Sequence, residues 1–178
     1  MRLFVFFILL AVSGVAFAVD TNSKEYKSAV EAYRFWYPTV SSEGLMHGLR
    51  TMGIKDNTHM FVSQAEGNVL AFTANQDTPY GSMVVDLAKG PFVIEMPAGP
   101  FMGLVNDHNQ NWIADMGLPG PDAGKGGKYL IVPPNYNGSA PADYHVGKSQ
   151  TNKVLIAMRI IPTDSDLQKA QDRLSEIK

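Results

Sequence analysis

Two short segments of this 178-residue chain are rich in side chains that could bind a ligand or move a proton. The first polar segment, residues 75–80, reads Asn-Gln-Asp-Thr-Pro-Tyr, and the second polar segment, residues 106–111, reads Asn-Asp-His-Asn-Gln-Asn. Side chains of these types either close a loop by bonding to one another or present a site. The first segment favours a turn, because Asn and Asp bond to their own backbone. Six consecutive polar residues exceed what one turn needs, so both alternatives stay open for the second.

Three of these residues could carry acid–base chemistry. Asp77 and Asp107 stand at the ends of apolar runs, and His108 titrates naturally near neutral pH. An enzyme using them, with or without a metal, is one alternative for the function. The four histidines occur at no ligand-like spacing, so the sequence predicts no metal site, and it identifies no cofactor.

A ligand-binding protein is the alternative that the sequence favours. Aromatic walls with a few convergent polar groups suit a small polar or aromatic ligand. We expect the strand ends bearing Asp77 and residues 107–111 to converge on one pocket, with Tyr80 or Trp112 at its wall. The candidate binding residues are Asn75, Tyr80, Asn109, Asn111 and Trp112.

The elements that would position these residues are mainly strands. Helical spacing of aromatic residues predicts a helix over 24–37 that packs on the core and is stopped by Pro38. A shorter helix, capped by Ser41 or Ser42, would end at Gly53. Short apolar runs separated by Gly/Pro turns then predict strands over 69–73, 83–87, 92–96, 101–105, 129–132 and 154–161. The fold class is therefore mainly β, an antiparallel β-sandwich or distorted barrel with N-terminal helices and one C-terminal helix.

The C-terminal helix is predicted over 163–178, where Thr163 and Asp166 resemble a capping box. Its narrow apolar stripe consists of Leu167, Ala170, Leu174 and Ile177. Such a stripe packs either on its own domain or on a separate partner, and in the second case the chain would be a subunit of an assembly.

The N-terminus and the composition indicate export. Arg2, an apolar run and Ala16-Phe17-Ala18 predict a signal peptide over 1–18, followed by a β-rich domain over 19–162. We expect the mature protein in the periplasm or outside the cell, with no later transmembrane segment. The net charge is −2 and no basic stripe occurs, which argues against nucleic acid. Without cysteine, thiolate chemistry is excluded.

Several motifs fall in a familiar order along the chain. They are Tyr33-Arg34-Phe35-Trp36-Tyr37-Pro38, Asn75-x-Asp77-Thr78-x-Tyr80, Asp86-Leu87, Lys89-Gly90-Pro91, Pro97, Asp107, Gly124-Lys125 and the run from Gly127 to Pro134. From Tyr26 to Ile177 the chain resembles the N-terminal domain of the exported bacterial family catalogued as domain of unknown function 1254. The resemblance implies export and a β-sandwich-rich fold, but no reaction. Many members carry a C-terminal companion domain that we expect to be missing here, so a separate partner or self-association is a further expectation.

Overall fold

The computed structural model describes residues 19–63, 75 and 77–178, and it divides at Phe35 into two units. The described part of the first unit, residues 19–35, contains the start of helix α1 (Lys24–Thr51). Ser23 caps this helix, because its hydroxyl oxygen accepts a hydrogen bond from the amide of Tyr26 at 3.1 Å. Everything discussed below lies in the second unit, residues 36–178.

Helix α1 continues through Pro38, so the prediction that this proline ends the helix is wrong. Proline at this position removes only one backbone donor, and a helix with other support tolerates that loss. The support comes from polar contacts to a distant loop: Gln110 donates to the Pro38 carbonyl at 3.3 Å, and Thr39 donates to Asn109 at 2.8 Å. Ser42 lies buried inside the helix, so the prediction of a second cap at Ser41 or Ser42 is also wrong.

The burial of α1 also differs from the prediction. Its buried residues are Ser42, Met46 and Leu49, all in the second half, rather than the aromatic positions between 26 and 37. Met46 and Leu49 are three residues apart and so share one face of the helix. They form a small core cluster with Val84 of the neighbouring sheet.

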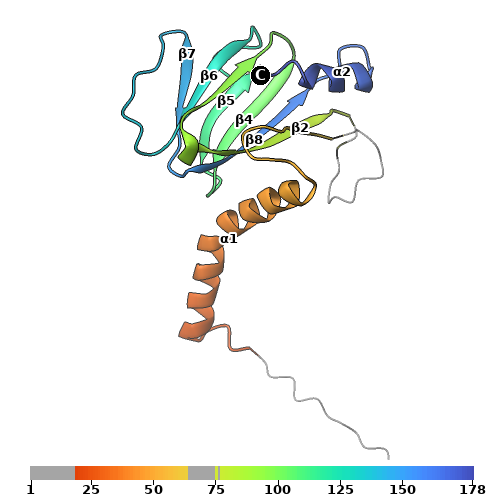
Figure 1. Ribbon diagram of the computed structural model, residues 1–178. Coiled ribbons are helices and arrows are strands. Elements are labelled where there is room, and N and C mark those ends of the chain that lie inside the picture. The colour runs from red at the N-terminus through yellow and green to blue at the C-terminus, as the bar shows by residue number, and fades with distance from the viewer. Residues whose placement is uncertain (1–18, 64–74, 76) are drawn as a thin grey trace, which may run out of the picture. The chain divides into compact units, whose positions relative to one another are not determined.

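Strands of the described residues form two sheets (Figure 1). The five-stranded sheet has the order β1-β2-β8-β4-β5, and the three-stranded sheet has the order β3-β6-β7. The strands are β1 (Phe61–Val62), β2 (Tyr80–Asp86), β3 (Phe92–Met96), β4 (Phe101–Asp107), β5 (Trp112–Gly117), β6 (Gly127–Val132), β7 (Tyr144–Lys148) and β8 (Lys153–Ile160), with a 3-10 turn at Leu87–Lys89.

Neighbouring strands pair antiparallel, with one exception. Strands β6 and β7 are parallel, and the connection over 133–143 carries the chain back between them. Strand β8, although last in sequence, pairs with both β2 and β4 and so lies in the middle of its sheet. The expected fold class, mainly β with one C-terminal helix, is confirmed, and a single long helix α1 takes the place of the two N-terminal helices expected.

The main core lies between the two sheets. Strand β8 shows why the sequence folds this way: its side chains alternate strictly between half-buried and buried. Val154, Ile156, Met158 and Ile160 point into the core, where they meet Ile94, Met96, Tyr129 and Ile131 of the three-stranded sheet. One face of the five-stranded sheet is therefore filled, and the opposite face, the outer face, carries the alternate residues of each strand.

Helix α2 (Leu167–Leu174) is shorter than predicted, and Asp166 rather than Thr163 is its N-cap. The Asp166 carboxylate accepts from the amide of Lys169 at 2.9 Å. Ala170 and Leu174 of the apolar stripe are buried in the main core, and Ile177 packs against it. These side chains are used within the chain, so the structure supports the alternative in which the stripe packs on its own domain.

Three strands were missed by the sequence patterns. Strand β7 reads Tyr-His-Val-Gly-Lys and has too few apolar residues to form a run, while β5 was obscured by the adjoining polar and glycine-rich segments. Strand β1 has only two residues. The strand expected over 69–73 lies outside the described residues.

Candidate functional site

The outer face of the five-stranded sheet is only partly covered. Its residues form cross-strand rows, because the pairing places Tyr80 beside Arg159 and Arg159 beside Met102. In the next row, Ala157 lies between Ser82 and Leu104, and Leu104 pairs with Asp115 of β5. The second half of α1 covers the part of the face near Val84 and Leu155. The rows from Tyr80 to Asp115 lie outside that cluster.

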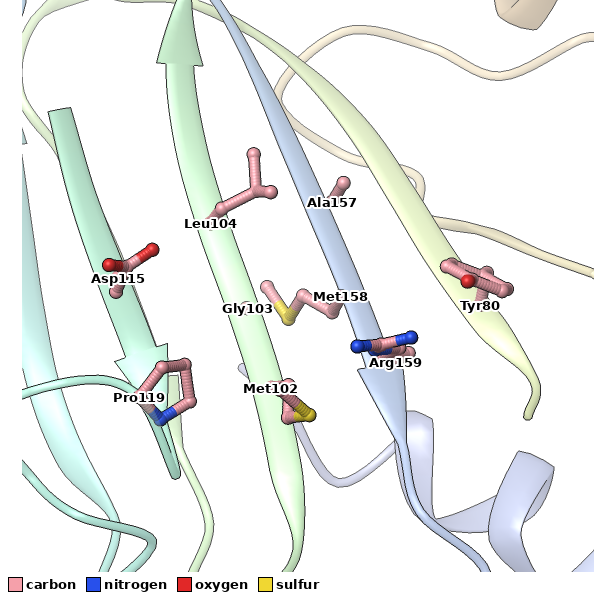
Figure 2. Close-up of a pocket in the computed structure, with 9 residues that line it drawn as sticks. All are labelled: Tyr80, Met102, Gly103, Leu104, Asp115, Pro119, Ala157, Met158 and Arg159. Carbon is pink, nitrogen blue, oxygen red and sulfur yellow. The ribbon is translucent and has the colours of Figure 1, made fainter. Parts of the chain in front are cut away.

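A cavity of about 430 Å³ lies over these uncovered rows. Figure 2 shows its walls on four strands: Tyr80 on β2, Arg159 on β8, Leu104 on β4 and Asp115 on β5. The hollow arises because Ala157 is short and the larger side chains surround it. The volume falls within the range of small-molecule sites, roughly 300–1,000 Å³. The lining residues are Tyr80, Met102, Gly103, Leu104, Asp115, Pro119, Ala157, Met158 and Arg159.

Arg159 is the cation of this cavity. It occupies an outward position near the end of β8, and it is half-buried. In the part of the chain that the structure describes, Arg159 forms no ion pair with a carboxylate. Arg50 and Arg173 differ from it, because each pairs with at least one acidic side chain.

Tyr80 stands next to Arg159, and the first polar segment holds its phenol. The Asn75 amide donates to the Tyr80 oxygen at 3.2 Å, and the Asn75 carbonyl accepts from the amides of Asp77 and Thr78. Partial burial acts to raise the pKa of Tyr80, but hydrogen bonds from Asn75, Arg159 and Thr78 outweigh it, so the pKa lies below its usual range. The segment is therefore a turn that also orients Tyr80, and Asp77 lies exposed beside it.

The second polar segment is a closed loop around Asp107. This carboxylate is buried, with 1% exposure, and one of its oxygens accepts from the amides of Asn109 and Asn111 at 2.8 and 2.9 Å. The side-chain amide of Asn111 donates to the other oxygen at 3.0 Å. Because both oxygens of Asp107 are occupied in closing the loop, its observed role is structural.

His108 and Asn109 join this loop to helix α1. Nε2 of His108 lies 3.0 Å from Glu43, whose carboxylate is also 3.2 Å from Lys153. The hydrogen bond from Lys153 is the main reason why the pKa of Glu43 is lowered, and the charges of Lys153, His108 and Arg50 act in the same direction against partial desolvation. Asn109 accepts from Thr39, as described above. These contacts fasten residues 39–43 to the sheet.

The two polar segments do not meet. The first precedes Tyr80 at the start of β2, whereas Asp107 ends β4; in the pairing with β8, Tyr80 lies opposite Arg159 and Asp107 opposite Val154. Five residues of an extended strand separate those positions, or about 16 Å. The prediction that the strand ends bearing Asp77 and residues 107–111 converge on one pocket is therefore wrong, because β2 and β4 run in the same direction on either side of β8.

Trp112, the other expected wall residue, borders a different and smaller cavity. This cavity has a volume of about 150 Å³ and is also lined by Tyr129 and His145. Trp112 itself is 66% exposed. Tyr80, by contrast, lines the large cavity, so of the two expected wall residues it is the one that the structure places beside a cavity of ligand size.

A buried network that the sequence patterns did not reveal supports the glycine-rich turn after β5. The Asp122 carboxylate accepts from the hydroxyl of Tyr129 and, at 2.8 Å, from the amide of Gly117. Burial and the neighbouring Asp122 charge raise the pKa of Tyr129 well above its usual range. The network fixes the turn that carries Pro119, and so it shapes one wall of the large cavity.

Metal chemistry finds no support in the described residues. They contain no group of three or more His, Asp or Glu side chains placed to hold a metal ion.

The sequence does carry a signal for the observed cavity: Arg159 is the one charged residue inside the apolar run over 154–161. Alternation along a strand puts it on the face opposite Met158 and Ile160.

One of two similar solved structures agrees with this fold at a TM-score above 0.5. A crystal structure of the VPA0106 protein from Vibrio parahaemolyticus is similar with a TM-score of 0.64 and 17% identity, over 85% of this chain and 38% of that one. A crystal structure of an uncharacterised protein from Burkholderia cenocepacia matches with a TM-score of 0.42 and 10% identity, over 80% of this chain and 39% of that one. The chain thus spans less than two fifths of either protein's length. No curated protein matches it.

Within the described residues, no helix has both the length and the apolar character needed to cross a membrane. The family model described as protein of unknown function DUF1254 matches residues 57–178, which include every strand of both sheets. Over two thirds of its length, therefore, this chain belongs to the DUF1254 family.

Proposed function

We propose that this domain binds a small organic ligand in the outer-face cavity. The observation that carries the proposal is a cavity of about 430 Å³ whose wall is mostly apolar and carries three polar side chains, Tyr80, Asp115 and Arg159. Apolar walls with a few placed polar groups are the usual composition of small-molecule sites. We further propose that the domain does so outside the cytoplasm, which the predicted signal peptide over 1–18 supports.

Filling the cavity tests the proposal, because a side chain that occupies the hollow leaves no room for a ligand. In Ala157→Phe, an aromatic ring would replace the methyl group at the bottom of the hollow, on a strand position that accepts aromatic residues well. The matched control is Ala142→Phe, which adds the same ring at an exposed position before β7. Both variants should fold, and only the first should lose ligand.

The assay is thermal unfolding of residues 19–178 with a panel of para-hydroxyphenylpropanoate, para-hydroxyphenylpropanamide and para-hydroxyphenylpropanol. A ligand present at 100 times its Kd stabilises the folded state by about 2.7 kcal/mol. For a domain of this size that corresponds to a rise of roughly 5–10 °C in Tm. We expect the rise in the wild type and in Ala142→Phe. The proposal fails if no panel member raises Tm, or if Ala157→Phe responds like the wild type.

The second proposal has its own test. Expression of the full chain in a Gram-negative host should yield, in the periplasmic fraction, a protein whose N-terminus is Val19. Recovery of the uncleaved chain from the cytoplasm alone would contradict it.

A further inference from the structure

We propose that the ligand of the outer-face cavity is an organic carboxylate with an apolar middle and a hydrogen-bond donor at its far end. Arg159 and Tyr80 would hold the carboxylate, and Asp115 would accept from the donor. This inference rests on the proposed function, because it names the class of ligand for the same cavity.

The guanidinium of Arg159 gives the cavity a positive charge. This group offers five N–H donors in a planar fork that matches a carboxylate with two parallel hydrogen bonds. It is half-buried between Tyr80 and Met102, and no described carboxylate pairs with it. Arg50, by comparison, places two of its nitrogens 3.0 and 2.8 Å from the two oxygens of Asp56. An anionic ligand would give Arg159 the partner that Arg50 already has.

The hydroxyl of Tyr80 is a second hydrogen-bond donor beside Arg159. The Tyr80 oxygen accepts a hydrogen bond from the Asn75 amide at 3.2 Å, and Arg159 is the partner of Tyr80 in the strand pairing. A phenol also carries a proton of its own, so Tyr80 can donate to an acceptor that enters the cavity. The lowered pKa of Tyr80 shows that this environment stabilises negative charge. Tyr80 and Arg159 therefore present donors to the same small volume, which suits a carboxylate and not a cation.

Arg159 and Asp115 lie at opposite ends of the cavity, and the strand spacing sets the distance between them. From Arg159 on β8 to Asp115 on β5 the cavity crosses two strand spacings, or about 10 Å. The side chains between them are Ala157, Met102 and Leu104, the last with 39% exposure. Asp115 forms no ion pair with a described cation, and as a carboxylate it only accepts. A ligand that spans the cavity thus needs an anionic end, an apolar middle and a donor end.

Isothermal titration of residues 19–178 with three probes tests each part of this inference. The probes are para-hydroxyphenylpropanoate, its primary amide and phenylpropanoate, which lacks the hydroxyl donor. A carboxylate should bind about 10- to 100-fold more tightly than the amide, as expected for hydrogen bonds to a charged group. Phenylpropanoate should bind about 10- to 100-fold more weakly than its hydroxylated analogue, because the charged Asp115 loses its hydrogen-bond partner.

Variants assign each effect to a residue. Arg159→Gln should abolish the preference for the carboxylate over the amide, and Arg159→Lys should keep part of it, because lysine retains the charge without the planar fork. Asp115→Ala should remove the difference between the hydroxylated and the plain carboxylate. Lys125→Gln removes one positive charge at an exposed position outside the cavity and is the matched control; its affinities should equal those of the wild type.

The outcomes separate this inference from the proposed function. If the acid and the amide bind equally and Ala157→Phe abolishes both, the cavity binds ligands but the carboxylate assignment is wrong. If Lys125→Gln loses the preference as Arg159→Gln does, the effect is general charge attraction and the assignment of Arg159 is wrong. If no probe binds the wild type, both the proposed function and this inference fail.

Discussion

Replacing Gly117 by alanine tests whether the turn after β5 is fixed as tightly as the structure shows. Gly117 has a φ of +73°, and a Cβ added there would lie 2.2 Å from the carbonyl oxygen of Phe101. That oxygen accepts from the amide of Leu118 at 2.8 Å, and the amide of Gly117 donates to the buried Asp122. Alanine can therefore be accommodated only if the backbone moves and these hydrogen bonds lengthen or break.

The magnitude follows from these contacts. A left-handed conformation costs an alanine about 1–2 kcal/mol. Loss of the neutral hydrogen bond to Phe101 adds about 0.5–1.5 kcal/mol, and loss of the bond to the charged Asp122 adds about 1.5–3 kcal/mol. Gly117→Ala should thus lower the free energy of unfolding by about 3–6 kcal/mol. It should also weaken ligand binding, because Pro119 at the cavity wall lies two residues further along the same turn.

Gly53→Ala is the matched control for the backbone term. Gly53 also has a positive φ, +86°, but a Cβ there would meet no atom within 4 Å. Only the conformational cost of about 1–2 kcal/mol remains. Urea unfolding of the wild type and the two variants measures the difference. If Gly117→Ala is no more destabilising than Gly53→Ala, the contact with Phe101 does not constrain the turn and the reasoning is refuted.

Two further predictions concern buried side chains. Tyr129→Phe should cost about 1.5–3 kcal/mol, because Asp122 loses a donor, whereas Tyr136→Phe, whose hydroxyl contacts only the Ser139 carbonyl at the surface, should cost less than about 0.5 kcal/mol. Because the pKa of Tyr129 is raised in the folded state, the stability that its hydroxyl contributes is complete below pH 10.0. Above that pH the free energy of unfolding should fall by up to about 1.4 kcal/mol per pH unit. Urea unfolding of the wild type should show this alkaline loss, and that of Tyr129→Phe should not. Leu174→Ala should cost about 2–5 kcal/mol by leaving a cavity in the main core, while Gln168→Ala on the exposed face of α2 should cost less than about 0.5 kcal/mol; equal values would show that α2 is not anchored through its stripe.

The sequence patterns predicted the fold class well where apolar periodicity is strong. The alternating residues of β8 and the runs that became β3 and β4 are recognisable because each strand must fill the core on one side. Local signals predict the wrong outcome at Pro38, where contacts to Asn109 and Gln110 outweigh the loss of a single donor. These contacts join residues 70 and 72 positions apart in sequence. Such tertiary support leaves no trace in the helix itself.

The candidate site was predicted only in part for a related reason. Tyr80 was recognised through its polar neighbours, and the structure places it at the cavity. Arg159 lies in a run whose apolar pattern indicates only core, and the pattern of β5, which carries Asp115, predicts no strand. Both residues join Tyr80 only through the strand order of the sheet. The convergence of Asp77 with the second polar segment was wrong because composition marks the ends of strands without telling which ends are adjacent.

The central position of β8 has a consequence for the order in which the protein can fold during synthesis. Strands β2 and β4 are on either side of β8, which spans Lys153–Ile160, so neither can complete its hydrogen bonding until residue 160 has left the ribosome. Until then their exposed edges must be kept from pairing with other chains. Contacts between segments so distant in sequence also make folding slow. A ribosome-bound chain halted before residue 153 should therefore remain open to proteolysis and depend on chaperones, whereas one with a linker added after residue 178, long enough to bring β8 out of the exit tunnel, should resist.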